Sequence, residues 1–149
     1  MAAPIDRSEG PAPSERMLTR VRTAARVEGI TKTVGVSTLV TGEIAQSLSP
    51  ERILARRVAR FLPVGMTTEL DLYTIEPTPA DVAARQQICA RHALHAQALT
   101  AFEQGNWEKA FELLHPIVKE DAPARYLYSL AIQRIPPRDF HGCIELTTK

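Results

Sequence analysis

The first regular pattern of apolar and polar residues lies between Met17 and Gly35. Apolar side chains recur there every three to four positions, with arginines between them. This spacing predicts an amphipathic helix, for which Thr19 is a suitable N-cap. The β-branched run at residues 36–40 lies between glycines and predicts a short strand, and a short helix is expected over residues 42–48.

Two longer strands are predicted between Arg56 and Ile75. Apolar and basic residues alternate imperfectly in the first half, and apolar and polar residues alternate better in the second. The segment 63–66 between them contains a proline and a glycine and is typical of a hairpin connection. The Pro-Thr-Pro sequence at 77–79 marks a boundary, because prolines block continuation of the strand and stiffen the link.

Beyond this boundary the chain is predicted to be helical almost to its end. Helices are expected over residues 80–103, 107–119 and 123–134, followed by a short strand near the C-terminus. Small and large apolar residues around one glycine are typical of a tetratricopeptide-like helix pair. Solenoids need about three such units, so the pair is interpreted as a cover for an apolar face, with a docking surface as the alternative. The residues concerned are Ala98, Phe102, Gly105, Trp107 and Ala110.

Composition excludes several classes of protein. The 149 residues are 44% apolar and 23% charged, close to the average of globular proteins. The net charge of +1 gives no reason to expect a nucleic-acid surface, and no apolar run approaches the roughly 18 residues of a membrane span. Two separate cysteines and no secretory signal favour the cytoplasm. Residues 1–16, rich in proline and charge, are predicted to be a disordered tail.

Three sets of side chains are candidates for a functional role. His92 and His95 are three apart on a predicted helix, but without a third ligand they are interpreted as surface histidines. Cys89 and Cys143 are interpreted as buried small side chains rather than reactive thiols. Four arginines with helix-like spacing are interpreted as a solvated face, with phosphate or an acidic partner as the alternative: Arg52, Arg56, Arg57 and Arg60.

Several successive segments of the chain resemble successive parts of one protein family. VRTAARVEGITK, residues 21–32, resembles VNTAARLEGLTK, which is found late in class III adenylate and guanylate cyclase catalytic domains. Residues 36–48 resemble the strand and helix that follow there, and residues 60–77 resemble the terminal hairpin. The tail FHGCIELTTK resembles the W/F-x-G-x-x-x-L-T-x-K ending that some bacterial cyclases carry after a helical extension. Together the segments cover about residues 20–149.

The resemblance implies a specific reaction. Class III cyclases convert ATP or GTP to a 3',5'-cyclic nucleotide and pyrophosphate, using two Mg or Mn ions held by two aspartates. An asparagine orients the ribose, and an arginine one helical turn later stabilises charge on the phosphate. Arg26 occupies the arginine position, whereas Arg22 replaces the asparagine. Because such sites form between two cyclase domains, a homodimer or pairing with a fuller cyclase chain is implied.

The resemblance also implies what this chain lacks. The Gly-Asp pair before the asparagine is replaced by Leu18 and Thr19, and Val64 replaces the lysine before the hairpin glycine. The metal-binding aspartates belong to strands that precede this region in the family, where this chain has Asp6 in a proline-rich leader. No metal or cofactor site is therefore expected in this chain, and the base preference stays open.

These patterns together predict an α/β chain of the α+β type. Residues 17–77 are expected to form a partial class III cyclase catalytic domain, a truncated or degenerate remnant of its ferredoxin-like fold. Residues 80–149 are expected to form an α-helical extension with a tetratricopeptide-like hairpin. The expected function is that of the nucleotidyl cyclase family in cyclic-nucleotide signalling, without activity of the chain alone. The alternative is a non-catalytic protein-interaction module that uses the helical hairpin.

Overall fold

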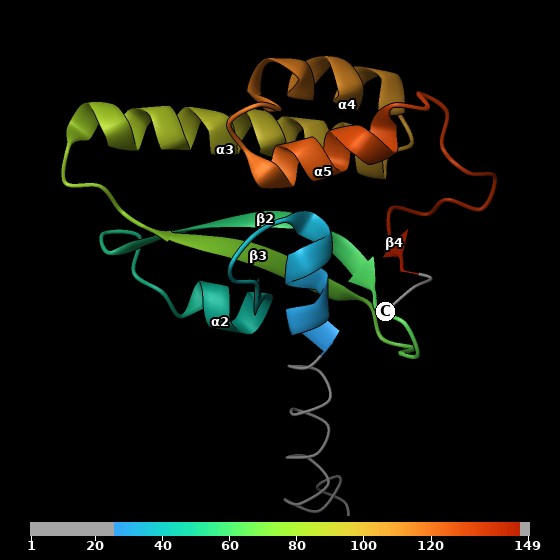
Figure 1. Ribbon diagram of the computed structural model, residues 1–149, viewed down its shortest axis with the longest axis horizontal. Helices are drawn as coiled ribbons and strands as arrows, with labels where there is room; N and C mark the ends of the chain where they lie inside the picture. The colour runs from blue at the N-terminus through green and yellow to red at the C-terminus, as the bar shows by residue number, and fades with distance from the viewer. Residues whose placement is uncertain (1–25, 147–149) are drawn as a thin grey trace, which may run out of the picture.

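The computed structural model describes residues 26–146 of the chain (Figure 1). The fold is mixed α+β, with a four-stranded sheet between α3, α4 and α5 on one side and α2 on the other. The predicted tail at residues 1–16, the first part of the predicted first helix, and Arg22 lie outside the described residues.

The central hairpin is the largest part of the sheet. It consists of β2 (Ile53–Leu62) and β3 (Leu70–Pro77), which pair antiparallel with a bulge in β2 after Arg57. The short strand β1 (Val40–Thr41) pairs antiparallel with β3, and β4 (Ile144–Glu145) pairs parallel with β2. The strand order is therefore β1-β3-β2-β4.

The helices agree with the sequence pattern in position and differ from it at their ends. Residues 26–34 are helical. The helix predicted over residues 107–119 already ends at Leu114, and a 3₁₀ turn that contains Pro116 follows it. The predicted strand at residues 36–40 is shorter than expected, because β3 offers partners only to Val40 and Thr41. The labelled helices are α2 (Gly42–Gln46), α3 (Val82–Glu103), α4 (Trp107–Leu114) and α5 (Ala122–Ala131).

Local chemistry explains where the long helix begins and ends. The preceding strand stops at Pro77, and the side chain of Asp81 caps α3 by accepting a hydrogen bond from the Ala84 amide at 3.0 Å. Gly105 turns the chain after α3, and the Asn106 side chain caps α4 through the Lys109 amide at 3.2 Å. The predicted break between these two helices is therefore confirmed.

One hydrophobic core joins the sheet to both groups of helices. It contains Val27 and Ile30 of the first helix, Phe61 of β2, and Leu127 of α5, all buried. The helix of residues 26–34 starts beside the hairpin connection and ends beside α5, since a Cβ on Gly35 would lie 3.8 Å from that of Ala122. The helical extension thus packs onto the same core as the hairpin.

An aromatic cluster lies where α3, α4 and the segment before β4 meet. Phe102 of α3 stacks on Trp107 of α4 with a centroid distance of 4.7 Å and an angle of 7°. Phe140 packs edge-on against both rings at 5.1 Å, which brings the segment before β4 onto the helix pair. The Trp107 indole N–H donates to the Phe102 carbonyl at 3.2 Å, so the polar atom of this buried ring is satisfied.

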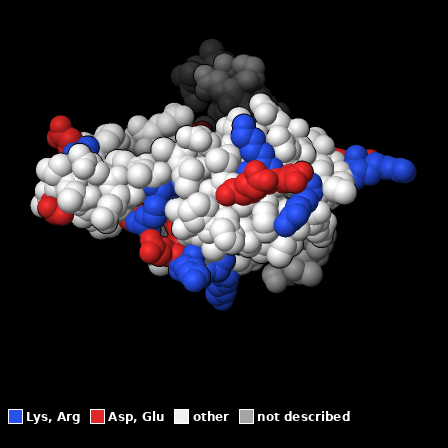
Figure 2. Space-filling model, turned by 90° about the horizontal axis from the view of Figure 1, so that it is seen from above, with Lys and Arg blue, Asp and Glu red and all other residues white. Residues whose placement is uncertain are grey.

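The outer face of the helical layer carries few charges. Figure 2 shows this face, where acidic and basic side chains lie in small mixed groups on a mostly uncharged surface. No helix among residues 26–146 is both long enough and apolar enough to cross a membrane.

The aromatic cluster predicts a large effect of truncating Phe102, which is 1% exposed. Phe102→Ala should lower the free energy of unfolding by about 3–5 kcal/mol, because it leaves a cavity and removes the stacking partner of Trp107. Urea denaturation would measure this loss. Ile135→Ser, at a side chain 76% exposed, is the control and should change stability by less than about 0.5 kcal/mol. A loss below about 1 kcal/mol in Phe102→Ala would contradict a tightly packed cluster.

Candidate functional site

Arg26 lies against the turn of the central hairpin. Its guanidinium nitrogen is 3.4 Å from the position that a Cβ on Gly65 would occupy. Gly65 belongs to the connection between β2 and β3, so the first helix and this connection meet at the predicted site residue. None of the ion pairs found among residues 26–146 involves Arg26. The glycine thus leaves room for a half-buried guanidinium that no described carboxylate neutralises.

Of the other residues that the resemblance points to in this region, the structure describes only Val64. Leu18, Thr19 and Arg22 lie outside the described residues. Val64 is half-buried in the connection next to Gly65. Among the described residues, Arg26 is therefore the one polar residue named by the resemblance that lies at the hairpin turn.

The aspartates of residues 26–146 do not form a site for two metal ions. Asp71 pairs with Arg57 and Arg60, Asp121 pairs with Arg56, and Asp81 caps α3. The fourth, Asp139, is exposed in the segment before β4. The single group of three potential metal ligands within these residues contains Glu69, His141 and Cys143, and no aspartate. The described part of the chain therefore does not fit the two-metal site that the resemblance implies.

The most buried charges of the fold lie between the sheet and α5. Arg56 of β2 donates two hydrogen bonds to the carboxylate of Asp121, one of them at 2.8 Å, and both side chains are 7% exposed. Burial favours the neutral acid, but the hydrogen bonds and charge of Arg56 outweigh it and lower the pKa of Asp121. The pair fixes the start of α5 over β2.

The prediction that four arginines form one solvated helical face is therefore wrong for Arg56, whereas Arg52 and Arg60 are exposed as expected. Arg56, Arg57 and Arg60 lie on β2, and Arg56 is buried rather than solvated. A strand alternates its faces, and the bulge after Arg57 shifts that alternation by one residue. The neighbouring arginines therefore lie in different environments, and not on one face as a helical spacing would predict.

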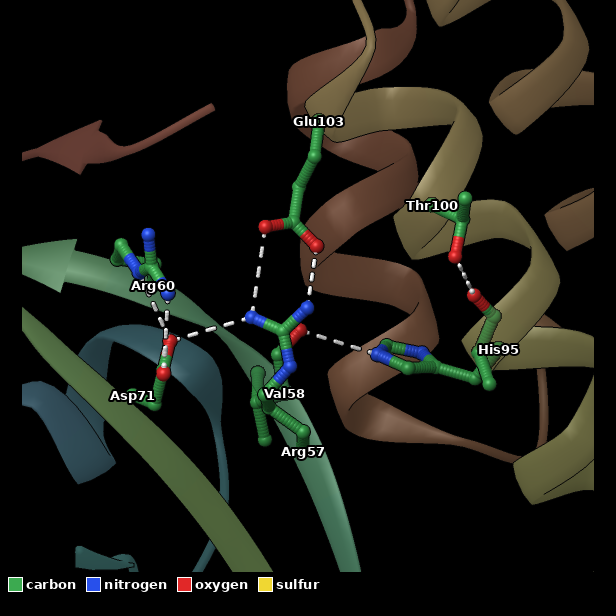
Figure 3. A network of polar contacts seen from close by, with 8 residues as sticks. Arg57, Val58, Arg60, Asp71, His95, Thr100 and Glu103 are labelled. Carbon is green, nitrogen blue, oxygen red and sulfur yellow. Dashed lines mark hydrogen bonds and ion pairs between the residues drawn. The ribbon is translucent and has the colours of Figure 1, made fainter. Parts of the chain in front are cut away.

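A second ion-pair network joins β2, β3 and the end of α3 (Figure 3). Arg57 pairs with Glu103 and also reaches Asp71 at 3.2 Å, and Arg60 binds the same aspartate at 3.0 Å. Burial opposes ionisation of Asp71, but both arginines favour it, so its pKa is lowered. Because these charges neutralise one another, the network is a structural link rather than an anion site.

His92 and His95 of α3 contact different strands. The Nε2–H group of His92 donates to Glu76 of β3 at 2.8 Å, whereas that of His95 donates to the Val58 carbonyl of β2 at 3.1 Å. His95 is fully buried and His92 half-buried, so their interpretation as surface histidines is wrong. His95 lies on the apolar stripe of α3 that faces the sheet, and this periodicity was the signal for its burial.

Burial also changes the titration of both histidines. Desolvation and the nearby Arg56 charge lower the pKa of His95 to about 4 and also lower that of His92. The Nδ1 atom of His95 has no hydrogen-bond partner in the structure. The neutral ring is therefore the form that fits this interface.

Two cavities open beside these groups. One of about 380 Å³ lies between β2 and α3, and another of about 370 Å³ borders the aromatic cluster. Arg56, Arg57 and His92 line the first, but all three already have carboxylate partners. The first cavity therefore offers no unpaired cation for a nucleotide phosphate. Arg138 lines the second cavity, and none of the ion pairs among residues 26–146 includes it.

Glu69, His141 and Cys143 lie close together where the end of the hairpin connection meets the segment before β4. Both ring nitrogens of His141 donate hydrogen bonds, to Glu69 at 3.0 Å and to the Asp139 carbonyl at 3.3 Å, which raises its pKa. Burial and the Glu69 charge raise the pKa of the Cys143 thiol to about 12. Cys143 is buried, as predicted, whereas Cys89 is exposed, contrary to the prediction. Sequence spacing could not indicate this group, because 72 positions separate Glu69 from His141.

Comparison with known proteins adds no relative, since no protein-family model, curated protein or solved structure matches this chain.

The buried pair predicts that Asp121→Asn destabilises the fold. The substitution leaves the Arg56 charge buried without a counter-charge, and the free energy of unfolding should fall by about 3–5 kcal/mol in urea denaturation. Adding Arg56→Met should recover much of this loss, because it removes the unpaired charge. Asp71→Asn is the matched control at a side chain 33% exposed, with an expected loss below about 1 kcal/mol. Equal losses in Asp121→Asn and Asp71→Asn would contradict the dominance of the buried pair.

His95 predicts a loss of stability in mild acid. An unfolded histidine binds a proton near pH 6.5, whereas folded His95 does so only near pH 4. Between these values the unfolded chain binds more protons, so stability falls as the pH falls, by about 3 kcal/mol for this residue. His92 acts in the same direction, and Asp121, which faces the same arginine, loses its stabilising charge below that window.

The variant His95→Gln isolates this contribution. Glutamine can donate to the Val58 carbonyl but does not titrate, so the slope of stability against pH between 6.5 and 4 should become flatter. Thermal or urea unfolding across this window measures the slope, and His115→Gln, at an exposed histidine, should keep the original one. An unchanged slope in His95→Gln would show that other groups control the acid sensitivity.

Proposed function

We propose that this chain is a segment of a class III nucleotidyl cyclase that is inactive by itself. In this proposal Arg26 contributes to a site that forms a 3',5'-cyclic nucleotide and pyrophosphate from ATP or GTP. The metal-binding aspartates of that site come from another cyclase domain, either in a fuller cyclase chain or in a second protomer. The proposed setting is cytoplasmic cyclic-nucleotide signalling.

The position of Arg26 is the observation that carries the proposal. The guanidinium lies at the hairpin turn beside Gly65, and none of the ion pairs among residues 26–146 includes it. A half-buried arginine without a carboxylate partner is suited to bind a phosphate oxygen. In the proposed reaction it stabilises the negative charge that develops on the phosphate as pyrophosphate leaves.

The order of elements supports the same proposal. The resemblance implies a helix, a short strand, a short helix and an antiparallel hairpin, and residues 26–34, β1, α2 and the β2–β3 hairpin follow in that order. We assign these elements to the C-terminal part of a ferredoxin-like cyclase fold. We assign α3 and α4 to a tetratricopeptide-like pair, in keeping with Gly105 at their turn and the stacking of Phe102 on Trp107.

Inactivity of the chain alone follows from its carboxylates. Two-metal catalysis needs two aspartates that converge on the nucleotide, whereas among residues 26–146 the buried Asp121 and the partly exposed Asp71 are each held by arginines. We therefore derive no metal-dependent step from the described residues. Among residues 26–146, the proposed contribution to the reaction comes from Arg26 and from the surface of the hairpin connection.

A non-catalytic interaction module is the second candidate. Ile132 and Ile135, just after α5, are 57% and 76% exposed, and the outer face of the helical layer is mostly uncharged (Figure 2). Exposed apolar side chains of this kind are found where helices dock onto a partner.

Complementation would test whether Arg26 is functional. The chain is mixed with a class III cyclase catalytic chain that keeps its metal-binding aspartates but has its own transition-state arginine replaced by alanine. Cyclic nucleotide is then measured with ATP or GTP and manganese. We expect no turnover from either chain alone and turnover in the mixture. Arg26→Ala should lower the turnover of the mixture on the order of 10²–10³-fold.

Controls separate a specific role of Arg26 from a folding defect. Arg85→Ala, at an exposed position in the first turns of α3, should support the same turnover as the original chain. Circular dichroism should show the same helix content in both variants. Turnover by the chain alone would contradict its inactivity. A mixture that binds without turnover would refute the catalytic role and favour the interaction module.

A further inference from the structure

Glu69, His141 and Cys143 bring a carboxylate, an imidazole and a thiol to one point. Their ligand atoms all lie within 4.8 Å of one another, and the Nε2 atom of His141 is 3.0 Å from Glu69. These donors come from the residue before β3 and from the segment before β4, so the fold rather than the local sequence brings them together. We propose that these three side chains bind one Zn²⁺ ion.

The backbone holds the two C-terminal ligands in place. His141 and Cys143 flank Gly142, whose φ of +94° is a conformation that other residues rarely adopt. A Cβ on Gly142 would lie 3.4 Å from the Glu103 carbonyl, so glycine also permits a close approach to the end of α3. Ile144 then pairs with Phe61 of β2, which fixes the chain directly after Cys143.

The orientation of His141 suits a metal ligand. Its Nδ1–H group donates to the Asp139 carbonyl at 3.3 Å, and Nε2 points at Glu69. Metal-binding histidines commonly donate their second ring nitrogen to a carbonyl or carboxylate in this way, which fixes the ring and the tautomer. Without metal a proton lies between Nε2 and Glu69, and a cation bound there takes the place of that proton.

The donor set favours zinc over magnesium or calcium. Zn²⁺ accepts sulfur, nitrogen and oxygen ligands in a tetrahedral arrangement, whereas Mg²⁺ and Ca²⁺ prefer oxygen alone. Cys143 binds the ion as a thiolate, and its thiol proton is released to the solvent, because the positive charge of the ion favours the deprotonated form. Glu145 adds negative charge nearby, and Arg60, whose positive charge also acts on Cys143, is engaged by Asp71.

The site is open to solvent on one side. Cys143 is buried, but the side chains of His141 and Glu69 are 53% and 37% exposed. Three protein ligands leave the fourth tetrahedral position to water or to an external ligand. The ion would tie the hairpin connection to the segment before β4, a strand of two residues that has little pairing of its own. This inference does not depend on the proposed cyclase function.

Metal titration of the full chain tests the site. Isothermal titration calorimetry with Zn²⁺ should show one ion per chain, and thermal unfolding should shift to higher temperature with Zn²⁺ but not with Mg²⁺. Co²⁺ in place of Zn²⁺ should give the visible absorption of a tetrahedral ion and a thiolate-to-metal charge-transfer band. His141→Ala and Cys143→Ser should weaken binding by more than about tenfold, and Glu69→Gln should weaken it less.

Matched variants make the test decisive. Cys89→Ser and His115→Ala remove an exposed thiol and an exposed imidazole from other parts of the fold and should leave binding unchanged. His141 is exposed, so His141→Ala should keep the native circular dichroism spectrum even if Cys143→Ser perturbs the core. The proposal is overturned if the full chain binds no Zn²⁺, if folded His141→Ala binds it as before, or if Cys89→Ser or His115→Ala abolishes binding.

Discussion

The buried ion pair between Arg56 and Asp121 determines how the helices sit on the sheet. Removing two charges from water is costly, and only close, bidentate geometry offsets that cost. Asp121 is the residue directly before α5, so this geometry fixes the start of that helix relative to β2. His95 adds a second polar contact across the same interface through the Val58 carbonyl. Apolar packing alone would allow the helices to shift along the sheet. The ion pair and the His95 hydrogen bond form only in one position of the helices relative to β2.

Much of this fold follows from local signals in the sequence. The Pro-Thr-Pro boundary at 77–79, the alternation in β3 and the glycine between α3 and α4 act over a few residues, and the corresponding elements are found. The environment of Arg56 has no such local signal. Its partner lies 65 positions away, and the strand bulge changes which face each arginine occupies. For His95 the spacing to Ala98, Leu99 and Phe102 indicated a shared helix face, but its contact with the Val58 carbonyl depends on how that face meets the sheet.

The candidate site shows the same division between local and distant information. The segment around Arg26 could be recognised from neighbouring residues, and so could the hairpin turn at Gly65. Their contact depends on how the first helix crosses the sheet, which no local pattern encodes. The members of the group of Glu69, His141 and Cys143 are further apart in sequence, because Glu69 lies in the hairpin connection and the other two lie in the segment between α5 and β4. Cysteine spacing alone therefore predicted no metal site.

The hairpin connection links the two proposed sites. Gly65 lies against Arg26, and Glu69 follows four positions later in the same connection, next to His141. The connection has few strand hydrogen bonds of its own, so its position depends on what holds its end. A metal ion at Glu69 would anchor that end to the segment before β4 and limit the motion of the surface beside Arg26. Such an ion would affect Arg26 only indirectly, by fixing the position of the hairpin connection, because the two sites share no ligand.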